Sequence, residues 1–146
     1  MFSKSYSRFC LAGSEEKLAF CKDIRVDVCI NYKTEDFVAR VKEETGGQGV
    51  DIILDCMGAS YYQRNLDSLN FDGRLFILGF QEGTSTQTDL RTLVAKRLTV
   101  QGVANFGLYR FLVDALLACW KMLKIENSLT HLSHTLLSVF VIMLPL

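Results

Sequence analysis

The sequence contains almost no proline and no excess of charge of either sign. Pro145 is the single proline among 146 residues, so proline gives no sign of a linker between domains. Sixteen basic residues balance sixteen acidic ones, and we therefore expect no general electrostatic attraction to nucleic acid or to an anionic membrane. A chain of this length fits one domain with a useful hydrophobic core.

Segments typical of export or of membrane insertion are also missing. The first ten residues carry Lys4 and Arg8 but no apolar core long enough for a secretory signal. The apolar run from Leu136 to Leu146 has about half the length of a membrane-spanning helix. We therefore expect no membrane span and a cytoplasmic location.

Paired cysteine motifs are absent as well. The chain has five cysteines, an odd number without CxxC spacing. His131 and His134 lie far along the chain from most of them, which gives little support to a zinc site. We expect reduced and mostly buried thiols rather than a disulfide framework, as is usual in cytosolic proteins. The cysteines are Cys10, Cys21, Cys29, Cys56 and Cys119.

Short apolar runs alternate with helical patterns from residue 9 to residue 103. Strands are predicted at residues 9–12, 26–32, 50–55, 74–79 and 98–103. Helices are predicted after the N-caps Ser14 and Thr34, and over Ser60–Phe71 and Leu90–Arg97. Asp72-Gly73 is predicted to turn from a helix into the next strand. Continuous apolar strands separated by helices favour an α/β fold, with a parallel sheet covered on both faces.

The stretch Thr45–Gly58 carries the most specific local pattern. The glycines within residues 46–49 supply the positive-φ freedom that ends a helix and reverses the chain. Val50–Leu54 is a short apolar run, rich in β-branched residues, that is typical of a buried strand. Gly58 follows at the carboxyl end of this strand, where open α/β sheets bind ligands. The pattern predicts one βα unit of a nucleotide-binding sheet.

The sequence of this stretch, TGGQGVDIILDCMG, resembles part of the cofactor-binding domain of medium-chain dehydrogenase/reductases. The resemblance is closest to the zinc-free, zeta-crystallin-like quinone oxidoreductases. The likeness continues in register on both sides and covers roughly residues 11–103. It includes Leu11–Lys17, Cys29–Phe37, Asp72–Phe80 and Ala95–Gly102, which resemble the regions of the family's second, third, fifth and sixth strands. The resemblance implies an NADPH cofactor and metal-free hydride transfer to a quinone or an activated carbonyl compound.

The family's phosphate-binding turn, between its first strand and first helix, has no match in the sequence. Neither GxGxxG nor the family's AxxGxxG occurs, and the family's order places that unit before Leu11. The resemblance therefore implies an incomplete Rossmann-like parallel sheet that lacks the first βα unit, whose strand is central in the 3-2-1-4-5-6 order. Exposed strand edges then promote self-association. The alternatives are that a tail segment fills the gap or that the fragment is unstable.

The resemblance divides the chain into three parts. Residues 1–10 match nothing, residues 11–103 form a partial dinucleotide-binding domain, and residues 104–146 form a divergent apolar tail. Leu108–Lys124 is predicted to be one apolar helix of this tail, while the fold of the remainder is open. The unbroken apolar run Val139–Leu144 must be buried against the sheet, another chain or an aggregate.

The position that distinguishes NADPH from NADH holds Gly13-Ser14 instead of an acidic residue. A carboxylate there would hold the ribose hydroxyls of NAD and repel a 2′-phosphate. Ser14, and Lys17 one helical turn later, suit that phosphate, and the resemblance implies that residues at the Lys17 and Tyr32 positions contact it. Carboxylates at residues 15 and 16 complicate the electrostatics of the site. The structural alternative is a helix cap at Ser14, a solvated Lys17 and a strand-end Tyr32.

The loops after the fourth and fifth strands match the family's nicotinamide-binding loops. Cys56 and Gly58 stand in the first loop, and Gly79 and Phe80 stand in the second. The alternative explanation is the glycine chemistry of any strand-to-helix turn. Asp55, at the end of its strand, is interpreted as a structural cap rather than a general base. We name no catalytic residue, because hydride transfer to a quinone depends on alignment and charge stabilisation more than on a dedicated base.

The sequence thus predicts a truncated cofactor-binding domain of an NADPH:quinone oxidoreductase, with little or no activity alone. Its expected partners are the nicotinamide cofactor, a quinone-type small molecule and, through exposed apolar surface, other copies of the chain. A second hypothesis is a non-catalytic remnant or interaction domain from a short isoform or gene model. A third, a small nucleotide-binding regulator, requires a different phosphate-binding turn, and none is apparent in the sequence.

Overall fold

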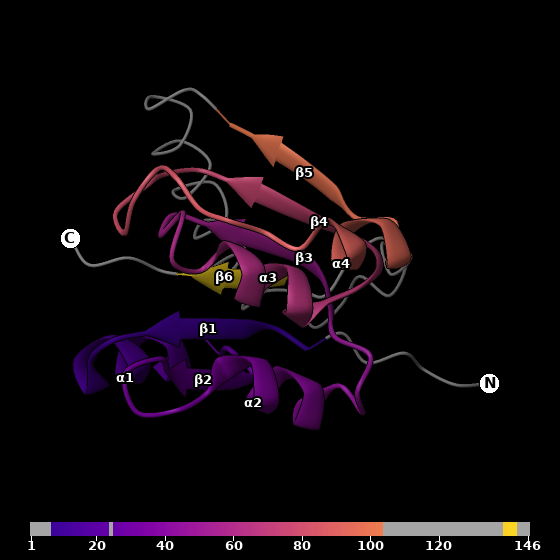
Figure 1. Ribbon diagram of the computed structural model, residues 1–146. Helices are drawn as coiled ribbons and strands as arrows, with labels where there is room; N and C mark the ends of the chain where they lie inside the picture. Colours follow the sequence, from indigo (N-terminus) through magenta and orange to yellow (C-terminus); the bar gives the residue numbers. More distant parts are fainter. Residues whose placement is uncertain (1–6, 24, 104–138, 143–146) are drawn as a thin grey trace.

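The computed structural model describes residues 7–23, 25–103 and 139–142, which contain a single parallel sheet (Figure 1). The strands are β1 (Phe9–Ala12), β2 (Val28–Asn31), β3 (Val50–Asp55), β4 (Leu69–Ile77), β5 (Thr99–Gly102) and β6 (Val139–Ile142). The helices are α1 (Glu15–Asp23), α2 (Phe37–Glu44), α3 (Tyr62–Ser68) and α4 (Leu90–Ala95). Among the described residues, no helix is long and apolar enough to cross a membrane. The predicted helix Leu108–Lys124 lies outside the described residues.

The strand order is β2-β1-β6-β3-β4-β5, and every neighbouring pair is parallel. This arrangement confirms the predicted Rossmann-like α/β fold. The central position, whose occupant the sequence left open, is taken by β6. Phe140 pairs with Phe9 of β1 on one side and with Ile53 of β3 on the other. The tail segment therefore gives both flanking strands a hydrogen-bonded neighbour and closes the two inner edges of the sheet.

The core has two layers because side chains alternate between the faces of a strand. On one face, Phe9 and Leu11 of β1 pack in a cluster with Phe37 of α2 and Leu66 of α3, all fully buried. On the other face, a smaller cluster is centred on α1. It contains Cys10, Ala12, Leu18, Cys21 and Val26. Helices thus cover both faces of the sheet, as the apolar strands predicted.

The cysteines differ in part from the prediction. Cys10 of β1 and Cys21 of α1 form a disulfide between the strand and the helix that follows it. The expectation that all thiols are reduced is therefore wrong for this pair, although both residues are buried as predicted. The strand-to-helix connection folds α1 back over β1, which brings two residues eleven positions apart together. Cys29 is half-buried and Cys56 is buried.

Helix α2 is capped by Asp36 rather than by Thr34, contrary to the prediction. The Asp36 carboxylate accepts a hydrogen bond from the N–H of Val38 at 3.1 Å. Thr34 and Glu35 instead form a turn on the end of β2, because their N–H groups donate to the carbonyl oxygen of Asn31 at 3.1 and 2.9 Å. The chain completes this turn before the helix begins.

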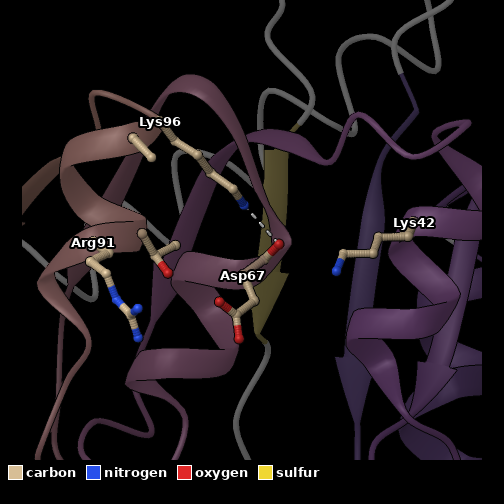
Figure 2. Close-up of a pocket in the computed structure, with 6 residues that line it drawn as sticks. Lys42, Asp67, Arg91 and Lys96 are labelled. Atoms are coloured by element: carbon tan, nitrogen blue, oxygen red, sulfur yellow. Dashed lines mark hydrogen bonds between the residues drawn. The ribbon is translucent and has the colours of Figure 1, made fainter.

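Helix α3 ends at Ser68, and β4 begins at once, so the predicted helix up to Phe71 is wrong beyond this point. Asp72-Gly73 still marks an irregularity: Asp72 has a φ of +59°, and the pairing of β4 with β3 changes register nearby. The cause of the early end is the ammonium group of Lys96. It donates hydrogen bonds to the carbonyl oxygens of Leu66, Asp67 and Leu69 at 3.0, 2.9 and 2.8 Å. Figure 2 shows the bond to Asp67. A cation here satisfies the last carbonyl groups of the helix.

Candidate functional site

The candidate site lies at the edge of the sheet where the parallel strands end. The sequence-predicted residues form two groups at this edge, on either side of β6 (Figure 1). One group, Ser14, Lys17 and Tyr32, follows β1 and β2. The other group follows β3 and β4 and consists of Cys56, Gly58, Gly79 and Phe80. Neighbouring strands lie about 4.8 Å apart, so β1 and β3 are separated by about 10 Å across β6. Open α/β sheets bind ligands at such a point, where the strand order reverses.

Tyr32 packs directly on Gly13. A Cβ atom at Gly13 would lie 2.5 Å from the Tyr32 hydroxyl oxygen, so only glycine permits this approach. The N–H of Tyr32 also donates to the carbonyl oxygen of Ala12 at 3.3 Å, which fixes the two loops together. The Tyr32 hydroxyl therefore lies against the strand-to-helix turn that precedes α1.

Ser14 and Lys17 lie at the start of α1. The Ser14 hydroxyl accepts a hydrogen bond from the N–H of Lys17 at 3.4 Å, and the Ser14 carbonyl accepts from the N–H of Leu18 at 3.1 Å. Ser14 thus takes the capping position that the structural alternative expected. Within the described part of the chain, the half-buried Lys17 side chain forms no ion pair. Its charge is therefore available to a ligand at this turn.

Backbone hydrogen bonds join the loops after β3 and β4 into one unit. The pairs are Leu78 N–H to Asp55 O (2.6 Å), Gln81 N–H to Cys56 O (3.2 Å), Glu82 N–H to Met57 O (2.7 Å) and Ala59 N–H to Gly83 O (2.9 Å). These bonds continue the pairing of β3 with β4 beyond the ends of the strands. Each loop therefore restrains the other, which makes the pair a rigid surface at the carboxyl edge.

Glycines permit the close contact between the two loops. Gly58 has a φ of +84°, and a Cβ atom there would lie 2.6 Å from the carbonyl oxygen of Gly83. A Cβ at Gly79 would lie 3.2 Å from the carbonyl oxygen of Cys56. The structure thus brings Cys56, Gly58 and Gly79 together. Phe80 extends from it with 58% of its surface exposed.

Asp55 holds the first of these loops from beneath. Its fully buried carboxylate accepts hydrogen bonds from the N–H groups of Met57 at 2.7 Å and Gly58 at 3.2 Å. Burial raises the pKa of this carboxyl group, and the two backbone donors oppose the rise. Asp55 is therefore the structural cap that the sequence analysis expected.

Tyr61 links the two halves of the site, a role that the sequence analysis missed. Its N–H donates to the carbonyl oxygen of Gly58 at 3.0 Å. Its ring meets that of Tyr32 edge-on, with centroids 6.0 Å apart, and stacks on Phe37 at 5.8 Å. Burial and, secondly, Tyr32 raise the pKa of Tyr61. The only sequence signal was an aromatic residue after the glycine loop, and such a signal is common at helix starts.

The family model described as "Zinc-binding dehydrogenase" matches residues 9–117, which is more than half of the chain. The chain belongs to this family. The match confirms the resemblance to quinone oxidoreductases of the medium-chain dehydrogenase/reductase superfamily, and it extends past the expected limit at residue 103. The chain therefore carries an oxidoreductase-type cofactor-domain fold.

Individual relatives agree with this assignment. The chain is 37% identical to prostaglandin reductase-3 of Mus musculus over 83 residues, which cover 57% of the chain and 22% of that protein. It is 39% identical to quinone oxidoreductase 1 of Escherichia coli over 67 residues, which cover 46% of the chain and 20% of the relative. The matched segment thus spans about a fifth of the length of these relatives.

A solved structure of Escherichia coli quinone oxidoreductase complexed with NADPH has the same fold. Its TM-score to this chain is 0.61 at 23% sequence identity, and the alignment covers 80% of this chain and 44% of the other. The family description also mentions zinc. In residues 7–23, 25–103 and 139–142, no three His, Cys, Asp or Glu side chains are grouped to hold a metal ion.

Proposed function

We propose that this chain binds NADPH at the carboxyl edge of its sheet, as the cofactor-binding part of a quinone-reductase-type oxidoreductase. The observation that carries the proposal is the turn after β1. It presents Gly13-Ser14 where a carboxylate would select NADH, and the Tyr32 hydroxyl and the Lys17 side chain come from the adjoining elements. A hydroxyl-bearing turn with an unpaired cation suits a dianionic phosphate.

The proposed roles follow the two halves of the site. Ser14, Lys17 and Tyr32 hold the 2′-phosphate of the adenosine ribose. The joined loops at Cys56–Gly58 and Gly79–Phe80 support the nicotinamide and its ribose. When bound, NADPH supplies the hydride, and the proposed acceptors are a quinone or an activated carbonyl compound. The contribution of these residues is to bind the cofactor and to orient its ring, because hydride transfer depends on alignment.

We infer little or no quinone reductase activity for this chain alone. The sequence contains neither GxGxxG nor AxxGxxG, the backbone turns that hold a cofactor's pyrophosphate in this kind of sheet. A turnover of about 1 s⁻¹ or more with NADPH and a simple quinone would overturn this inference, because that is within the usual range of enzymes. Nucleotide binding without turnover would agree with it.

The test of the proposed site is a titration of the purified chain with NADPH and with NADH, followed by nucleotide fluorescence. The unaltered chain should prefer NADPH. Lys17→Glu should reduce this preference by about 10- to 100-fold, since it removes a charged hydrogen bond and adds repulsion against the 2′-phosphate. Lys22→Glu is the matched control, because Lys22 lies in the last turn of the same helix.

Two results would overturn the proposal. One is an unaltered chain that binds neither nucleotide. The other is an NADPH/NADH ratio that is the same in Lys17→Glu as in the unaltered chain, which would make Lys17 a solvated helix residue.

A further inference from the structure

Besides Tyr32, the turn after β2 brings another residue to the turn before α1. The Lys33 side chain folds back over the β1–α1 turn: its Cε atom lies 3.0 Å from the position that a Cβ would take at Gly13. The Tyr32 hydroxyl oxygen lies 2.5 Å from the same position. The Lys33 ammonium group is one bond beyond Cε, so its charge is at the ribose-selecting turn. Within the described residues, Lys33 forms no ion pair.

Two carboxylates near this turn are held by Asn31. The side-chain amide of Asn31 donates a hydrogen bond to the Glu15 carboxylate at 3.0 Å. The backbone N–H of Asn31 donates to the Glu35 carboxylate, also at 3.0 Å. Glu35 is further engaged by the Arg40 guanidinium group at 3.7 Å. Asn31 therefore gives Glu15 and Glu35 partners of their own, and neither has to pair with Lys33.

Asn31 also fixes the backbone from which Lys33 extends. Its side-chain oxygen accepts a hydrogen bond from the N–H of Lys33 at 3.1 Å. Its carbonyl oxygen accepts from the N–H groups of Thr34 and Glu35. The side chain and main chain of one residue thus define the whole turn, as asparagine commonly does at strand ends.

We propose that Lys33 is a second cation for the 2′-phosphate of the cofactor, and that Asn31 is the positioning residue that directs Lys33 toward it and engages Glu15. The inference rests on the proposed function of the site and adds specificity residues to it. A carboxylate beside a bound phosphate would repel it, whereas two lysines with one hydroxyl-bearing turn match its charge. Glu16, the other acid of the first turn of α1, is exposed to solvent, where its charge is screened.

The experiment measures the dissociation constants of NADPH and NADH for the full chain and its variants, with 2′,5′-ADP and 5′-AMP as probes that lack the nicotinamide. Lys33→Gln should weaken NADPH and 2′,5′-ADP by about tenfold, the discounted effect of one exposed charged hydrogen bond. NADH and 5′-AMP should be unaffected. Lys42→Gln is the matched control, because exposed Lys42 lines a hollow of about 440 Å³ at the opposite, amino edge of the sheet (Figure 2).

Asn31→Ala tests the positioning role. It should also weaken NADPH selectively, and adding Glu15→Gln should restore part of the lost affinity, because the released carboxylate is then neutral. A purely structural defect would not be repaired by a change at Glu15. If Asn31→Ala weakens both nucleotides equally and Glu15→Gln restores nothing, the positioning role is wrong.

The remaining outcomes separate the two proposals. An unaltered chain that prefers NADPH, together with a Lys33→Gln variant of unchanged preference, would remove Lys33 from the site and leave the proposed function standing. Equal weakening of NADPH and NADH by Lys33→Gln would also overturn the inference. An unaltered chain that binds neither nucleotide would overturn both proposals.

Discussion

Gly58→Ala should destabilise the chain and distort the loop on which the nicotinamide is proposed to lie. Gly58 has a φ of +84°, which disfavours any residue with a Cβ, and the added carbon would lie 2.6 Å from the carbonyl oxygen of Gly83. The obstacle is backbone, and the neighbouring hydrogen bond from Ala59 N–H to that same oxygen prevents an easy shift. Relief of the contact must therefore separate the loops after β3 and β4.

The size of the effect follows from two contributions. A left-handed backbone costs a residue with a Cβ about 1–2 kcal/mol. Overpacking adds about 1–3 kcal/mol, so Gly58→Ala should lower the free energy of unfolding by about 2–5 kcal/mol. Gly46→Ala isolates the first contribution, because Gly46 has a φ of +61° and nothing within 4 Å of its added Cβ. Gly49→Ala, with a φ of +92° and a Cβ 2.5 Å from the carbonyl oxygen of Ser68, has both contributions but lies at the opposite edge of the sheet.

Urea unfolding followed by circular dichroism gives the three free energies, and an NADPH titration under conditions where all variants are folded gives the affinities. Gly46→Ala should lose only about 1–2 kcal/mol. Gly49→Ala should be as unstable as Gly58→Ala but retain its affinity for NADPH. Equal stabilities of Gly58→Ala and Gly46→Ala would refute the clash. Equal losses of affinity in Gly49→Ala and Gly58→Ala would show that general destabilisation, and not the loop, is responsible.

Three further predictions concern other parts of the chain. Lys96→Met should lower the free energy of unfolding by about 2–4 kcal/mol, because it removes the charged donor from three carbonyl groups at the end of α3. Lys42→Met, the control, should have little effect, and thermal unfolding measures the stability of both variants. Asp55→Asn should remove a pH dependence of stability. Because the pKa of Asp55 is raised in the folded state, the folded state binds more protons than the unfolded state, and stability falls as the pH rises from about 3.8. Urea midpoints between pH 4 and pH 7 should show this slope only when residue 55 is aspartate. Removal of residues 139–146 should expose the inner edges of β1 and β3 and cause association, and light scattering that detects a stable monomer would contradict this.

Local patterns were sufficient for much of the sheet. The strand Val50–Asp55 could be predicted because an apolar, β-branched run follows a glycine turn, and Gly46, Gly47 and Gly49 have the positive φ that their positions suggested. These features depend on the residues themselves and their immediate neighbours. The cap formed by Asp55 was predictable for the same reason, since its partners lie two and three residues ahead.

Contacts between distant segments were beyond local reasoning. The early end of α3 depends on Lys96, which lies 27 to 30 residues from the carbonyl groups that it satisfies. The link between the site's halves requires Tyr61, which follows β3, to contact Tyr32, which follows β2. The pairing of Asn31 with Glu15 spans 16 residues and changes the electrostatics that the two acids of α1 had suggested. No periodicity in the sequence encodes such long-range contacts.

The sequence by itself determined the type of fold, the parallel direction of its strands and the edge at which we propose that a ligand binds. These properties follow from side-chain periodicity, from glycine conformations and from the rule that ligands bind beyond the carboxyl ends of such strands. Only the tertiary structure decided that Val139–Ile142 occupies the centre of the sheet. Any apolar run can pair with two open strand edges, and the sequence alone does not say which apolar run takes that place. It likewise decided that Lys33 lies beside Gly13, because that position depends on how two separate turns pack against each other.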